Sequence, residues 1–103
     1  MKKIINNKVY DTETADYIAN YSYSNSRDFR HIDEDLYRTN KGTWFLAGYG
    51  GPLTDYRIQT EQNSWSGSSR ITPLTNTEAL KWLEERGETK AIEQYFNHCI
   101  EEA

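Results

Sequence analysis

The side chains best suited to metal binding or nucleophilic catalysis are few and poorly spaced. The imidazole and thiol groups belong to His31, His98 and Cys99, of which the last two are adjacent. Neighbouring residues on a helix project about 100° apart, so His98 and Cys99 do not converge on one tetrahedral zinc. Ser66 lacks the upstream glycine of a nucleophile elbow. The sequence therefore predicts no enzyme, no metal site and no cofactor, with Cys99 in the core.

A second candidate is the acidic run Asp33-Glu34-Asp35, which follows His31 closely. Carboxylates beside an imidazole are able to hold Mg²⁺ or to act as an acid–base pair in a small hydrolase or nuclease. The run lacks the alternating oxygen ligands and the glycine of an EF-hand. It is typical of a solvated loop, and we expect Asp33, Glu34 and Asp35 to contact a partner.

Aromatic residues are the other notable feature, since the chain has eight Tyr, three Trp and three Phe. These are too many for one small core, and exposed Tyr and Trp are favoured in protein interfaces, although scattered tyrosines also occur on ordinary surfaces. Trp65 stands in a polar stretch, where an indole packs back on the domain or touches a partner. We predict Trp65 as a partner-binding residue.

The net charge of −4 is placed unevenly along the chain. Residues 1–70 carry nine acids and nine bases, whereas residues 71–103 carry seven acids and three bases. A general nucleic-acid binder needs a basic surface, so direct nucleic-acid binding is not expected. The acids of the last third, among them Glu84, Glu85 and Glu88, predict contact with a basic partner.

Length and composition predict a single domain over residues 1–103. No apolar run reaches the roughly 18 residues that a membrane span needs, and the first residues turn polar too early for a signal peptide. A single cysteine agrees with a reducing compartment. We expect a cytoplasmic protein, without membrane partners, that is a monomer or a small homo-oligomer.

The first third of the chain predicts an extended segment, then a helix and then a loop. Residues 3–10 fit two short strands around an Asn-Asn turn, or one irregular strand. Residues 12–21 predict a helix capped by Asp11, because small and apolar side chains recur there at helical spacing. The polar residues 22–35 show no sustained period and predict a loop.

The remainder predicts a hairpin and then two helices. Residues 36–49 hold two β-prone runs around an Asn- and Gly-containing turn, and residues 59–69 read as a surface loop. A capping box, formed by Thr75 and Glu78, starts one helix, and an apolar stripe over 88–100 predicts another. The predicted fold class is α+β: a small antiparallel sheet with one N-terminal and two C-terminal helices.

A series of short motifs occurs in order along the chain from Lys3 to about Leu83. They are Lys3-Ile4-Ile5-Asn6 with Tyr10-Asp11-Thr12-Glu13-Thr14-Ala15, Leu36-Tyr37-Arg38, Gly42-Thr43-Trp44-Phe45-Leu46, Gly48-Tyr49-Gly50-Gly51-Pro52, Ser64-Trp65-Ser66-Gly67 and Ile71-x-Pro73-Leu74. The series resembles a family of small proteins encoded by phages and mobile elements of Gram-positive bacteria. That family is similar to anti-CRISPR inhibitors, which block Cas effectors by occupying DNA-binding or nuclease surfaces. The resemblance brings no catalytic residue with it.

The resemblance implies an inhibitor, in the cytoplasm of a bacterial host, that binds a host defence complex such as a Cas effector. Direct protein contact and partial mimicry of nucleic acid are both open. The alternative is a non-catalytic regulatory or accessory protein of the mobile element that works as a homo-oligomer or with an element-encoded partner.

Overall fold

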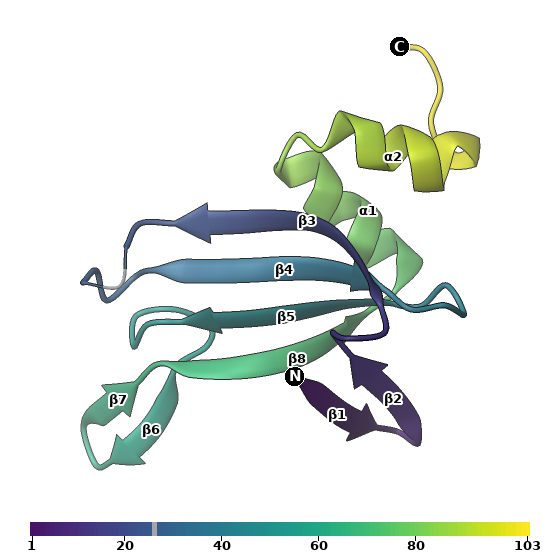
Figure 1. The fold of residues 1–103 in the computed structure, drawn as a ribbon. Coiled ribbons are helices and arrows are strands. Elements are labelled where there is room, and N and C mark those ends of the chain that lie inside the picture. Colours follow the sequence, from purple (N-terminus) through teal and green to yellow (C-terminus); the bar gives the residue numbers. More distant parts are fainter. Residues whose placement is uncertain (26) are drawn as a thin grey trace.

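The computed structural model describes residues 1–25 and 27–103, and these residues form a mostly β fold. They make eight strands in three antiparallel sheets, followed by two α-helices and a short 3-10 helix at the C-terminal end. Figure 1 shows one large sheet with the first helix crossing behind it, the second helix beyond strand β3 (Asp16–Tyr23), and two small hairpins projecting beyond strand β8 (Ser68–Leu74). In this described part of the chain, no helix is long and apolar enough to cross a membrane.

The large sheet has four strands in the order β3-β4-β5-β8. Their bounds are β3 Asp16–Tyr23, β4 Ile32–Arg38, β5 Trp44–Gly50 and β8 Ser68–Leu74. The predicted hairpin over 36–49 is confirmed as β4 and β5, whose turn closes at Gly42 with φ +86°, a conformation that favours glycine. Pro73 lies in edge strand β8, where a missing N–H is tolerated.

Two small hairpins flank the large sheet. β1 (Lys2–Ile5) pairs with β2 (Lys8–Asp11) across Asn6 and Asn7, both of which have positive φ as a tight hairpin turn requires. Of the two alternatives for residues 3–10, the two-strand one is therefore confirmed. β6 (Ile58–Glu61) pairs with β7 (Ser64–Ser66), so the surface loop expected over 59–69 was wrong.

The C-terminal helices are α1 (Asn76–Glu85) and α2 (Thr89–Phe96), and η1 (Asn97–Cys99) follows them. The capping box is confirmed: the Glu78 amide donates to Thr75 Oγ1 at 3.1 Å, and the Thr75 amide donates to the Glu78 carboxylate at 2.9 Å. Gly87 ends α1 with φ +66°. Cys99 is exposed rather than in the core, because the last apolar positions fall beyond the end of α2.

Each face of the large sheet carries a hydrophobic core. On the helix side, Leu36 and Trp44 are buried against Ala79, Leu83 and Phe96 of the two helices. On the other side, Phe45 and Ile71 are buried beneath Tyr10 of the first hairpin. The hairpin covers only part of this second side, and the rest is left open.

The N-terminal helix predicted over 12–21 is wrong, and with it the predicted α+β class with an N-terminal helix. Residues 16–23 form edge strand β3 instead, and Asp11 accepts the Glu13 amide at 3.0 Å within a turn. A register shift between Tyr17 and Ala19 marks a β-bulge. The bulge lets the consecutive residues Ile18 and Ala19 both face the core on the helix side of the sheet. Their spacing in the sequence therefore resembles the spacing of apolar residues in a helix.

The loop predicted over 22–35 is also wrong in its bounds. β3 extends to Tyr23 and β4 begins at Ile32, so the acidic run lies within a strand of the central sheet. Ser26, which that predicted loop includes, lies outside the described residues. Because a strand alternates its side chains between two faces, the change of bounds decides where each carboxylate points.

Candidate functional site: the open face of the sheet

The candidate site is the uncovered part of the sheet opposite the helices, which we call the open face. It consists of Tyr17, Asn20, Ser22, Asp33, Asp35, Tyr49 and Ser69. The strand register pairs Asn20 with Asp35, Ser22 with Asp33, and Asp33 with Tyr49. Tyr49 in turn pairs with Ser69 of β8. Residues that are directly opposite across a ladder project to the same face, so four strands bring these side chains together.

Asn20 links the two aspartates of the open face. Its Nδ2 donates to Asp33 Oδ1 at 2.7 Å and to Asp35 Oδ1 at 2.8 Å. The Ser22 hydroxyl also donates to Asp33 Oδ1, at 3.2 Å. These bonds hold two like charges close together on a partly exposed surface, in fixed orientations. The pair attracts cations more strongly than either carboxylate alone.

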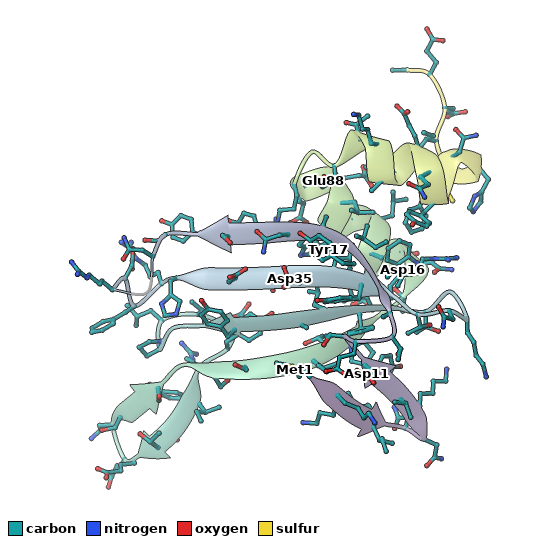
Figure 2. The ribbon with its side chains drawn as sticks, in the orientation of Figure 1. Met1, Asp11, Asp16, Tyr17, Asp35 and Glu88 are labelled. Carbon is teal, nitrogen blue, oxygen red and sulfur yellow. The ribbon has the colours of Figure 1, made fainter. Side chains whose placement is uncertain are left out.

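Aromatic side chains line one side of the carboxylate pair. Tyr17 meets Tyr37 edge-on, with ring centroids 5.9 Å apart, and Tyr37 stacks on Phe45 at 5.3 Å. Tyr17 is 57% exposed. Its pKa lies above the ordinary value because of partial burial and then because of the negative charges of Asp35, Glu88 and Asp33. Figure 2 shows Tyr17 beside Asp35, with Glu88 beyond it toward the helices.

A shallow hollow of about 210 Å³ lies on the other side of the pair. Its lining includes Asp33, Asp35, Tyr49 and Ser69, with Met1 and Thr12 of the first hairpin at its rim. The Met1 amino group donates to Thr12 Oγ1 at 2.9 Å, which fixes that rim. Tyr49 is 44% exposed and meets the His31 ring edge-on at 5.6 Å. The open face thus offers carboxylates and half-exposed aromatic rings.

Glu34, the middle residue of the acidic run, points to the helix side instead. The Tyr56 hydroxyl donates to its Oε2 at 2.6 Å, and Trp82 Nε1 donates to its Oε1 at 3.1 Å. Arg86 Nη2 lies 3.7 Å from Oε1, and the Glu34 side chain is only 14% exposed. A carboxylate so enclosed supports the packing of α1 on the sheet, and little of it is left to meet a partner.

The other predicted partner-binding residues lie in separate places. Glu84 and Glu85 are exposed on α1, behind the sheet, and Glu85 pairs with Arg86 at 3.3 Å. Glu88 precedes α2 and contributes its charge at Tyr17, near the open face. Trp65 is half-exposed on β7, and the Arg57 guanidinium covers its ring at 4.9 Å. The charges of Asp33, Asp35 and Glu88 all act on Tyr17, whereas Glu84 and Glu85 are exposed on α1 and Trp65 lies on β7.

The residues weighed for catalysis are not gathered into one centre. Residues 1–25 and 27–103 contain no group of three or more His, Cys, Asp or Glu side chains placed to hold a metal ion. His31 Nδ1 lies 2.6 Å from the Asp28 carbonyl oxygen, whereas His98 and Cys99 are exposed on η1. Ser66 donates to the Gly67 carbonyl at 3.3 Å, and within the described residues it makes no hydrogen bond to an imidazole.

Sequence reasoning did not assign Tyr17, Asn20, Ser22, Tyr49 or Ser69 to a site. The signal for Asn20 and Ser22 was an alternation of polar residues, because Asn20-x-Ser22 in one strand opposes Asp33-x-Asp35 in the next. That alternation is readable only when both segments are recognised as strands.

Comparison with protein-family models, curated proteins and solved structures finds no match to this chain.

Proposed function

We propose that this chain is a non-catalytic inhibitor that binds a host defence complex, a CRISPR effector, through the open face of its sheet. The observation that carries the proposal is the carboxylate pair of Asp33 and Asp35, which Asn20 holds at 2.7 and 2.8 Å. Side chains already fixed by hydrogen bonds lose little freedom on binding. A fixed pair of negative charges suits a basic protein surface.

The half-exposed tyrosines support a protein partner. Tyr17 and Tyr49 stand on opposite sides of the carboxylate pair, and they are 57% and 44% exposed. Tyrosine buries a large area at a low cost in conformational entropy and still offers a hydroxyl. An interface of this kind combines aromatic contacts with local charge pairing.

The class of partner follows from the sequence resemblance to phage and mobile-element proteins similar to anti-CRISPR inhibitors. Cas effectors hold nucleic acid in positively charged channels, so they present basic surfaces. The net charge of −4 is modest for mimicry of a nucleic acid by the whole molecule. Contact through one locally acidic face fits this charge better.

The test is plasmid interference in bacterial hosts that each carry one type of CRISPR effector. The wild-type chain is expected to protect a targeted plasmid in at least one host. The double variant Asp33→Asn/Asp35→Asn keeps side-chain size and is expected to lose at least about tenfold of that protection, since each lost close charge contact is worth about 1 kcal/mol or more.

The matched control is Glu84→Gln/Glu85→Gln, which makes the same change in net charge on α1. It is expected to protect as well as the wild type, and circular dichroism establishes that both variants fold. A wild-type chain that protects in no host, and binds no purified effector, would refute the inhibitor proposal. Equal loss in both double variants would refute the open face as the interface.

A further inference from the structure

A second site lies on the helix side, where Arg38 ends strand β4. Its guanidinium carbon is 5.6 Å from the ring centroid of Trp44 and 5.2 Å from that of Tyr95. The two rings meet edge-on at 5.3 Å, and Trp44 is only 2% exposed. Aromatic contacts favour the positive charge, but the N–H groups of a guanidinium lie in its plane and still need acceptors.

The charge of Arg38 lacks an anionic partner within the described residues. Nε is buried and makes no hydrogen bond there. The ion pairs of residues 1–25 and 27–103 involve Arg30 and Arg86 but not Arg38. Asp16 lies opposite Arg38 in the register of β3 and β4, yet no ion pair joins them. A partly buried cation without an acceptor is costly, which favours an anion from outside the chain.

A cavity of about 210 Å³ adjoins this arginine. Its lining includes Arg38, Gly42, Trp44, Asn76, Tyr95 and His98. Asn76 and His98, which also line it, carry further N–H groups. The volume is below the roughly 300 Å³ at which pockets for drug-sized ligands begin. It suits a single small group rather than a whole nucleotide.

We infer that this cavity binds an oxyanion, either a phosphate or a carboxylate group, with Arg38 as its main donor. A guanidinium presents parallel N–H groups that match two oxygens of such an anion. Lysine gives only a point charge, so the planar fork of arginine is the specific feature. This site is separate from the open face, and the inference does not depend on the proposed function.

The experiment follows the arginine Nε–H and tryptophan indole signals of the ¹⁵N-labelled chain by NMR. Inorganic phosphate and acetate are titrated separately against chloride at constant ionic strength. The Arg38 Nε–H and Trp44 indole signals, assigned from Arg38→Lys and Trp44→Phe, are expected to shift together and to saturate. Saturation by phosphate alone assigns a phosphate group, and saturation by both assigns any oxyanion. Saturation by neither overturns the inference.

Three variants complete the test. Arg38→Gln is expected to weaken binding at least about tenfold. Arg38→Lys loses the bidentate contact but keeps the charge, so it is expected to weaken binding less than Arg38→Gln does. Arg30→Gln removes an arginine whose side chain is 65% exposed, and it is expected to leave binding unchanged. If Asp16→Asn moves the Arg38 Nε–H signal in the absence of added anion, Asp16 is already the partner and the inference fails.

Discussion

Removal of the Glu34 carboxylate tests whether this middle residue of the acidic run stabilises the fold. In Glu34→Ala the Tyr56 hydroxyl and the Trp82 indole lose their acceptor, at distances of 2.6 and 3.1 Å, and Arg86 loses a carboxylate at 3.7 Å. Each hydrogen bond to a charged group is worth about 1.5–3 kcal/mol, and part of this loss is offset because the variant no longer buries a carboxylate, whose desolvation is costly. We therefore expect a loss of about 3 kcal/mol in the free energy of unfolding.

That loss is large enough for a simple assay. In a chain of this size 1 kcal/mol lowers Tm by roughly 4–8 °C, so Glu34→Ala is expected to melt at least about 12 °C below the wild type. Thermal and urea unfolding followed by circular dichroism measure the change. The control Glu84→Ala removes an exposed glutamate of α1 and is expected to stay within about 0.5 kcal/mol of the wild type.

A double-mutant cycle with Tyr56→Phe isolates the shortest contact of this network. The two changes are expected to be non-additive by about 1 kcal/mol or more, because each removes the same hydrogen bond. A Glu34→Ala loss below about 1 kcal/mol, or additive effects in the cycle, would refute the buried-network interpretation. Glu34 would then again be a candidate for contact with a partner.

Three further predictions concern pH, backbone packing and helix capping. Burial, and then the hydrogen bond to Glu34, raise the pKa of Tyr56 above its ordinary value of 10.0, so the folded state favours the neutral phenol. The stabilising effect of this raised pKa is complete below pH 10 and is lost as the pH rises above 10. Above pH 10 the urea midpoint is expected to fall less steeply with pH in Tyr56→Phe than in the wild type, and equal slopes would contradict this. A Cβ added at Gly67 would collide with the Gly50 carbonyl oxygen and lie 3.0 Å from Gly51 Cα, so Gly67→Ala is expected to lose about 1–3 kcal/mol in urea unfolding. Its control is Gly87→Asn, because nothing lies within 4 Å of a Cβ at Gly87 and asparagine tolerates its positive φ. Thr75→Ala removes the 3.1 Å acceptor of the capping box and is expected to cost about 1 kcal/mol, whereas an unchanged Tm would show that the cap contributes nothing.

The elements that the sequence predicts correctly are those with strong local signals. The capping box at Thr75 and Glu78 satisfies amides within one turn of the same helix, and Gly42 meets the positive φ of its own turn. Such signals depend on residues a few positions apart, so no distant contact is needed to read them. The same holds for the Asn6-Asn7 turn between β1 and β2.

The sequence by itself determined the C-terminal helices, the central hairpin and the presence of an acidic run. Only the tertiary structure decided that residues 16–23 are a strand, because the pairing of β3 with β4 overrides a weak helical period. The bulge in β3 turns Ile18 and Ala19 toward the core. The same pairing separates Asp33 and Asp35, on the open face, from Glu34, beneath the helices. Side chains alternate along a strand, so the direction of each carboxylate depends on a partner strand that lies far away in the sequence.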